Sequence, residues 1–278
     1  MADDKGRRFD PAQSFPSAAW LDGTPVVSEF VEEVEVVSDL TPAEWIAPRL
    51  LPRGRGHVIR VGSYIPTGYE AYARVFNPGR RKRGGGPVSW TEVARMTGRV
   101  AHPRMLWETI TYPAEGHPPV ASVGRPLDGL REAGLAATLV ETLRRHTSKP
   151  EQSWMAVWEG WADLPEADVP LIEHPDRRYV LLRGEIDAAA RPLWRDSRRG
   201  PLDYIGPSLW WPEDHAWCVA TEIDDLWTYV GGSRDCVDQL LGDERLEAFE
   251  VESSDTLFDN INPLPPELRK RMGLSDDS

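Results

Sequence analysis

The sequence is poor in cysteine and has no long apolar run. It has only two cysteines, Cys218 and Cys236, fewer than small disulfide-dependent secreted proteins usually carry, which favours a reducing compartment. No run of about 18 consecutive apolar residues is present, so the sequence predicts no membrane-spanning helix. The first residues, MADDKGRRFDPAQSF, lack the apolar core of a signal peptide. We therefore expect a cytoplasmic protein.

Motifs for common cofactors are also missing. No G-x-G-x-x-G follows a predicted strand, and there is no Walker A loop and no G-x-S-x-G elbow. None of the histidines stands at zinc-ligand spacing from another histidine or a cysteine. These histidines are His57, His102, His117, His146, His174 and His215. The sequence thus predicts no metal site and no cofactor, and it identifies no catalytic residue.

Positive charge is in short supply as well. The chain has 32 basic and 45 acidic residues, a net charge of −13. This balance repels nucleic-acid backbones and anionic membranes, so we expect neither as a partner. One basic run, Arg80–Arg83, stands alone, and we interpret it as a solvated loop. A protein partner is the remaining expectation.

The chain length and the turn-forming residues suggest one compact unit with two tails. Of the 278 residues, 1–19 read as a flexible tail and 262–278 as a proline-rich polar tail. Between them, 20–261 is expected to form a single compact domain. A subdivision near 113–126, which is rich in turn formers, stays open.

The order of predicted elements favours an α+β fold, with a mainly antiparallel sheet and helices packed on it. Helices are expected to start at Thr41, at Ser89, at Asp128 and at Ser233, where each sequence has a capping pattern. Expected strands cover 57–65, 69–77, 154–162, 177–186, 216–223, 227–232 and 246–251. The first two of these are expected to form a hairpin.

One stretch, SLWWPEDHAWCVATEIDDLWTYVGGS at 208–233, packs four tryptophans and five carboxylates into 26 residues. Alternation over 216–223 gives two apolar faces, as in a central strand covered on both sides. Asp224 and Asp225 then fall where a hairpin turn is expected. In this interpretation the stretch is part of the core.

A functional interpretation of the same stretch is also open. Two tryptophans would wall an apolar pocket with an acid and a histidine at its rim, and two carboxylates beside a tyrosine would bind a cation or act as a base. The candidate binding residues are Trp210, Trp211, Asp214, His215, Glu222, Asp224 and Tyr229. If Glu222 and Asp224 meet His215 in one deep cavity, an enzyme is favoured. If Glu222 and Asp224 only close a hairpin, an enzyme is not favoured.

The stretch 208–233 resembles a block that recurs in hypothetical proteins of high-GC actinobacteria, together with YIPTGYEAYARVFNP and WMAVWEGWADL. This resemblance implies no assigned function and no catalytic residue. Separately, Ile65–Tyr69 followed by Phe76 and Asn77 is similar to the proline-aromatic entry of SUKH-type immunity proteins, although Pro78 replaces the expected glycine. That resemblance implies an acidic, cytoplasmic α+β protein that binds a toxin.

Two hypotheses for function follow. The leading one is a non-enzymatic binding protein, immunity-like or regulatory, because the chain is acidic, rich in aromatic strands and without a recognised catalytic motif. It requires an apolar patch at the surface. The alternative is a small-molecule enzyme or ligand-binding protein with a tryptophan-lined pocket near residues 210–229.

Overall fold

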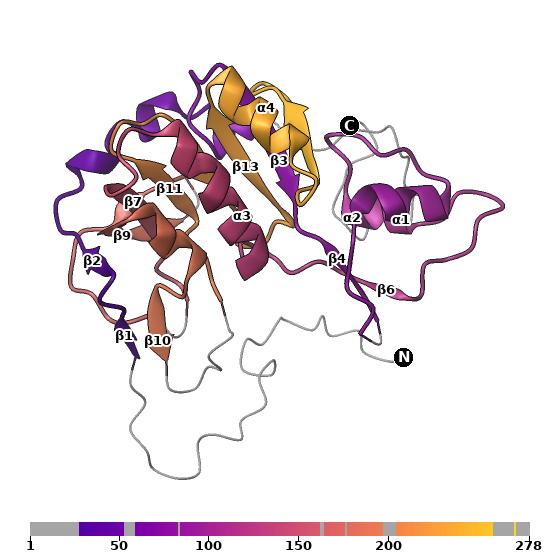
Figure 1. Ribbon diagram of the computed structural model, residues 1–278, viewed down its shortest axis with the longest axis horizontal. Coiled ribbons are helices and arrows are strands. Elements are labelled where there is room, and N and C mark those ends of the chain that lie inside the picture. The colour runs from indigo at the N-terminus through magenta and orange to yellow at the C-terminus, as the bar shows by residue number, and fades with distance from the viewer. Residues whose placement is uncertain are drawn as a thin grey trace, which may run out of the picture.

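The structure, a computed structural model, describes residues 28–52, 59–82, 84–161, 164–175, 177–196, 204–257 and 270. The predicted N-terminal tail, nearly all of the predicted C-terminal tail, His57 and Arg83 lie outside these ranges. No helix within them is long and apolar enough to cross a membrane. The described chain has an α+β fold with mainly antiparallel sheets, which confirms the predicted class (Figure 1).

A nine-stranded sheet forms the centre of the fold. Its strands run in the order β14 (Ala248–Val251), β3 (Ala71–Phe76), β13 (Trp227–Gly232), β12 (Cys218–Ala220), β11 (Leu209–Pro212), β7 (Ser153–Trp158), β9 (Arg178–Gly184) and β2 (Val34–Val36), and β8 (Ile172–Glu173) also pairs with β9. Neighbouring strands are antiparallel throughout. Strands from both halves of the chain therefore share one sheet.

Two smaller sheets lie beside the central one. One pairs β1 (Ser28–Phe30) with β10 (Trp194–Asp196), and the other has the order β5 (Pro87–Val88), β4 (Gly79–Arg81) and β6 (Val123–Gly124). The predicted loop over the basic run is thus wrong for Arg80 and Arg81, which lie in β4. Ion pairs fix them there, because Arg80 binds Glu132 (2.7 Å between Nη2 and Oε1) and Arg81 binds Glu92 (2.6 Å between the same atoms).

Helices and turns cover both faces of the central sheet, and both faces are accordingly apolar. One face packs under α3 (Ala133–Leu143), α4 (Arg234–Gly242) and the 3-10 helix η7 (Ile186–Ala190), and Figure 1 shows α3 lying across the strands. Leucines at every fourth position of α3 are buried there, namely Leu135, Leu139 and Leu143. Burial of this helix stripe holds it on the sheet.

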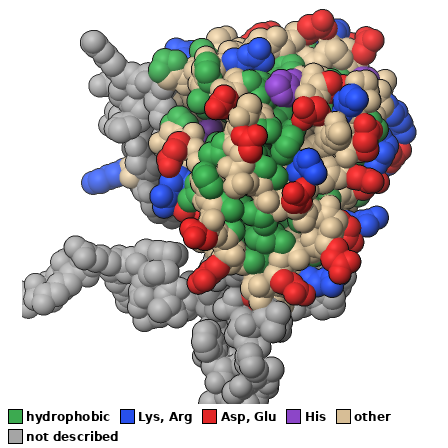
Figure 2. Space-filling model, turned by 90° about the vertical axis from the view of Figure 1, so that its left-hand side faces the viewer, with side chains coloured by type: hydrophobic (Ala, Val, Ile, Leu, Met, Phe, Trp, Pro, Cys, Tyr) green, Lys and Arg blue, Asp and Glu red, His purple; other side chains and the backbone are tan. Residues whose placement is uncertain are grey.

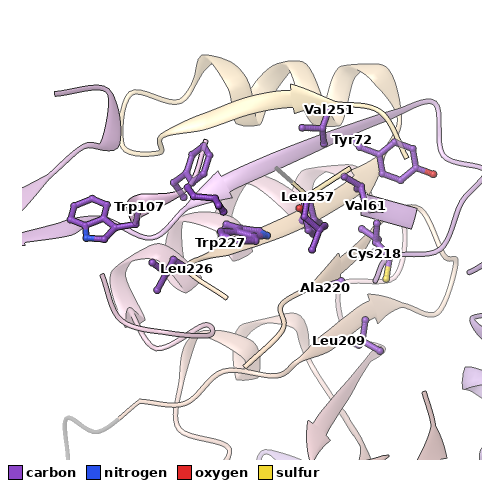
Figure 3. Packing of buried hydrophobic residues seen from close by; sticks show 14 of the residues in the cluster. Val61, Tyr72, Trp107, Leu209, Cys218, Ala220, Leu226, Trp227, Val251 and Leu257 are labelled. Carbon is purple, nitrogen blue, oxygen red and sulfur yellow. The ribbon is translucent and has the colours of Figure 1, made fainter. Parts of the chain in front are cut away.

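The opposite face is covered by α1 (Trp90–Thr97), α2 (Trp107–Thr111) and the 3-10 turns η2 (Thr41–Ala43) and η5 (Val61–Ser63). A third 3-10 turn, η3 (Ala47–Arg49), follows η2 and has no buried residue. Trp227 and Leu226 pack there among residues of distant segments, including Trp107 and Leu257 (Figure 3). Side chains of β3 alternate between the two faces, because Tyr72 and Phe76 are buried on this face whereas Ala73 and Val75 are buried on the α3 face.

Two of the four predicted helix starts are confirmed. The Ser89 side chain accepts a hydrogen bond from the Glu92 N–H (3.0 Å), and Gly98 ends α1 with a left-handed φ of 69°. The Ser233 side chain accepts from the Cys236 N–H at the start of α4 (3.2 Å). Both caps are local, so the sequence alone could reveal them.

The other two helix predictions need correction. The predicted helix after Thr41 is two separate 3-10 turns, η2 and η3, each with a proline in its first turn. The helix predicted from Asp128 begins at Ala133 and ends with the 3-10 turn η6 (Arg144–His146). Gly129 has a φ of 64°, which no helix accommodates, and its N–H donates to the Asp225 carbonyl (2.7 Å).

The predicted hairpin of 57–65 with 69–77 is wrong. Residues Val61–Ser63 form η5, because the N–H groups of Val61 and Gly62 donate to the carbonyls of Asp255 (2.9 Å) and Ser253 (2.8 Å). The strand β3 instead lies between β13 and β14. A further strand, β11, was not predicted, although it carries two of the candidate site residues.

Candidate functional site

Trp210 and Trp211 lie in β11, between β7 and β12, and both are fully buried. Trp210 packs against Trp217 on the α3 face, with ring centroids 5.2 Å apart. Trp211 packs on the opposite face, where its ring centroid is 6.1 Å from that of Trp45. The two tryptophans point to opposite faces and cannot wall one pocket together.

Asp214 is bound to a neighbouring loop. Its carboxylate accepts hydrogen bonds from the Ser148 N–H (2.7 Å), the Ser148 hydroxyl (2.8 Å) and the Thr147 hydroxyl (2.9 Å). Partial burial opposes ionisation, but these bonds outweigh it and lower the pKa of Asp214. The residue therefore closes the turn after β11.

His215 is the next residue in that turn. Its ring stacks on Trp45 at 4.4 Å between centroids, and its backbone is left-handed, with φ 51°. Histidine adopts this conformation more readily than most residues. Burial lowers the pKa of His215, because a charged imidazolium would lose water contacts.

Glu222 and Asp224 lie at the other end of β12 and share one partner. The Arg177 guanidinium donates to Glu222 (2.8 Å between Nη2 and Oε1) and to Asp224 (2.8 Å between Nη2 and Oδ2). The Asp225 N–H donates to the Glu222 carbonyl and closes the turn before β13 (3.1 Å). These carboxylates close a hairpin and do not converge with His215, and Tyr229 is buried in β13.

A cavity does touch this end of the stretch, but it is small. It has a volume of about 10 Å³ and is lined by residues that include Ser208, Thr221 and Glu222. This is room for about one water molecule. A substrate does not fit there.

A much larger concavity lies elsewhere in the described chain. It is an open groove of about 770 Å³ between the β4–β5 hairpin, the start of α3 and the turn before β14. None of the seven candidate residues lines it. Its charged side chains mostly have partners within the chain, as Arg80 has Glu132, and the Glu247 carboxylate accepts the Thr91 N–H (2.6 Å) at the start of α1.

A different surface stands out by its charge. The segment 28–48 contains six acidic residues and no lysine or arginine, and all six are exposed. We call it the acidic edge, because it includes β1 and the outermost strand β2. Its carboxylates belong to Glu29, Glu32, Glu33, Glu35, Asp39 and Glu44.

Most of these carboxylates have no ion pair among the described residues. Glu35 pairs with Arg183 (2.8 Å between Oε2 and Nη2). A hydrogen bond from Thr41 lowers the pKa of Asp39. The carboxylates of Glu29, Glu32, Glu33 and Glu44 form no ion pair with any residue that the structure describes.

Half-buried apolar side chains alternate with these acids. They are Phe30, Val31, Val36, Val37, Leu40 and Trp45. Figure 2 shows hydrophobic side chains running through the middle of the face that carries this segment, with acidic side chains on both sides. An apolar centre with a charged rim is typical of protein–protein interfaces.

This segment is not among the candidate sites expected from the sequence, although its excess of acidic residues is visible there. Twenty-one consecutive residues lack any basic side chain and include six acids. What the sequence could not show is which acids have partners. The sequence likewise could not show that the tryptophans of 208–233 are buried and that most of its acids have partners within the fold.

The geometry of these regions is the basis for any functional assignment. No family model, curated protein or solved structure matches this chain. Within the described residues, no group of three or more histidine, cysteine, aspartate or glutamate side chains is placed to hold a metal ion. The resemblances to actinobacterial proteins and to SUKH-type proteins stay predictions.

Proposed function

We propose that this chain is a binding protein and that its acidic edge docks a partner protein with a positively charged surface. The observation that supports this is the set of exposed carboxylates over 28–48, four of them without an ion pair or a hydrogen bond among the described residues. Like charges held together repel one another and destabilise the fold slightly. A cationic partner relieves that repulsion on binding.

The partner is a protein and not a small cation because of the extent of the surface. The carboxylates are spread along 21 residues and two sheets, and apolar side chains are interleaved with them. Complementary charge of this kind speeds association and excludes wrong partners, while apolar contacts supply affinity. Immunity or regulation by neutralising a basic protein is the role that fits.

The test compares two charge-neutral variants with equal loss of charge. The edge variant carries Glu29→Gln, Glu32→Gln and Glu33→Gln. The control variant carries Glu115→Gln, Glu151→Gln and Glu244→Gln, three exposed residues without an ion pair among the described residues. Partners captured by the wild type from source-cell lysate are identified by mass spectrometry, purified, and titrated against all three proteins at low and physiological salt.

We expect the edge variant to bind a basic partner about tenfold more weakly, the control variant to bind like the wild type, and salt to weaken the wild type most. A captured partner that binds the edge variant as tightly as the wild type contradicts the proposal. So does a partner whose affinity is independent of salt.

The groove supports a second candidate, a protein that holds a small ligand. Its volume of about 770 Å³ falls within the range of ligand pockets. Gly134 lines it, and a Cβ atom added at Gly134 has open space within 4 Å. Gly134→Trp should therefore direct its ring into the groove, and circular dichroism of the variant checks that the fold is kept. Native mass spectrometry of both proteins tests this, and a ligand retained equally by the variant argues against the groove.

A further inference from the structure

The outer side of β2 has backbone groups that pair with no described residue. The Val37 N–H donates to the Leu181 carbonyl (2.9 Å), which sets the alternation along the β2–β9 ladder. Glu35 and Val37 therefore direct their backbone groups towards β9, whereas Val34 and Val36 direct theirs away from it. No described residue forms a hydrogen bond with the N–H or the carbonyl of Val36.

Side chains of β2 differ between its two faces. Val34 and Val36 pack on the α3 face of the sheet, and Val36 stays half-exposed. Glu35 and Val37 point to the opposite face, where Glu35 is exposed. A strand placed beside β2 would meet a carboxylate on one face and an apolar side chain on the other.

We infer that the cationic partner adds an extended segment to the outer edge of β2, with basic residues alternating with apolar ones. This inference rests on the proposed function and specifies how the same acidic edge is used. Basic side chains of the segment lie beside Glu35 and Glu33, and its apolar side chains lie beside Val36. The backbone of the segment bonds to the outward groups of Val36, as in other cases of strand addition.

The experiment uses a short peptide of alternating lysine and valine, blocked at both ends, as the probe. A second peptide of the same sequence is N-methylated at alternate residues, so it keeps the charge but loses backbone donors on one edge. Val36→Pro removes the outward N–H without removing a bond to β9, since proline is tolerated where the N–H of an edge strand faces solvent. Val36→Thr keeps the N–H and the β-branched shape, and serves as the matched control.

We expect the wild type and Val36→Thr to bind the unmodified peptide alike. Val36→Pro should bind it about tenfold more weakly, and the wild type should bind the N-methylated peptide about tenfold more weakly than the unmodified one. On binding, the Val36 amide of the wild type should become protected from hydrogen exchange. If circular dichroism shows that Val36→Pro unfolds, the two peptides with the wild type decide the question.

The outcomes separate this inference from the proposed function. If the wild type binds both peptides equally and the edge variant binds both weakly, strand addition is wrong and the charge-based docking stands. If the wild type binds both peptides equally and the edge variant binds the unmodified peptide as tightly as the wild type does, strand addition and the proposed function are both contradicted. A wild type that binds neither peptide contradicts both.

Discussion

Two regions of this molecule, 28–48 and 208–233, are both rich in carboxylates, yet their carboxylates differ in the partners that they have. In the second region Asp214 binds Ser148, and Glu222 and Asp224 bind Arg177. In the acidic edge four of six carboxylates have neither an ion pair nor a hydrogen bond among the described residues. The density of acids in a sequence therefore does not show whether those acids have partners within the fold, and it is the cluster of acids without such partners that our proposal concerns.

The largest expected difference between the two regions is the loss of unfolding free energy when a tryptophan is replaced by alanine. Trp211→Ala removes a fully buried side chain and should lower the free energy of unfolding by about 3–5 kcal/mol. Trp45→Ala, in the acidic edge, removes a half-buried side chain and should cost roughly 1–2 kcal/mol. Urea unfolding measures both. Equal costs would show that Trp45 belongs to the core as fully as Trp211 does.

Asp225 is the exception within 208–233, because one oxygen of its carboxylate is buried without a hydrogen bond among the described residues. The Oδ2 atom has no accessible surface and no partner among the described residues. Burial raises the pKa of Asp225 from 3.8 to about 7, although the Arg74 guanidinium opposes this. Glu222, Asp224 and Asp128 also favour the protonated form.

This pKa makes stability depend on pH in a definite direction. The folded state holds a proton that the unfolded chain releases between about pH 4 and pH 7. The contribution of Asp225 is therefore full at low pH and is lost as the pH rises through about 7. Asp225→Asn should stabilise the protein by about 1–3 kcal/mol at pH 8 and less at pH 5. Urea unfolding at both pH values measures this.

The exposed neighbour Asp224 provides the control. Asp224→Asn should change stability by less than about 1 kcal/mol at either pH, since the Asp224 side chain is 78% exposed. A loss of stability in Asp225→Asn at pH 8 would contradict the prediction. It would mean that the Asp225 carboxylate is ionised in the folded state and stabilised by Arg74.

Ion pairs of the two regions allow a direct comparison of like with like. Glu222 and Arg177 have side chains only 11% and 25% exposed, whereas those of Glu35 and Arg183 are 64% and 55% exposed. A double-mutant cycle with Glu222→Gln and Arg177→Gln should give a coupling energy of about 1 kcal/mol or more. The cycle at Glu35 and Arg183 should give at most about 0.5 kcal/mol.

Thermal or urea unfolding of the four proteins in each cycle measures the coupling. Glu222→Gln should leave any ligand affinity in the groove unchanged, because Glu222 does not line the groove. Equal coupling in the two cycles would remove the distinction between the regions. A larger coupling at Glu35 would indicate that the acidic edge is part of the stabilising framework.

Local signals explain what the sequence could predict. The caps at Ser89 and Ser233 are made within four residues, and the alternation along β3 follows from its own side chains. The α+β class follows from the order of such elements. Predictions of this kind need no knowledge of the rest of the chain.

Failures of prediction came from bonds between distant segments. The strand expected over 57–65 is a turn because its N–H groups bond to residues about 190 positions away, at Ser253 and Asp255. The helix expected from Asp128 is delayed because Gly129 is tied to Asp225. The prediction of a binding site over 208–233 failed for the same reason, since the partners of Asp214 and Glu222 lie 66 and 45 residues away.

The smallest expected effect is the stability change of the edge variant. Replacing Glu29, Glu32 and Glu33 by glutamine removes no ion pair among the described residues, so the free energy of unfolding should change by less than about 0.5 kcal/mol. At low salt the change should be zero or stabilising, because charge repulsion falls. Urea unfolding at two salt concentrations measures it.

This measurement distinguishes a structural role of the three carboxylates from a role in partner recognition. A loss of more than about 1 kcal/mol would mean that these carboxylates hold the fold together, as Asp214 and Glu222 do. Weaker partner binding by the edge variant would then have a structural explanation. A variant as stable as the wild type that has lost its partner leaves recognition as the reason for keeping exposed acids together on one edge of the sheet.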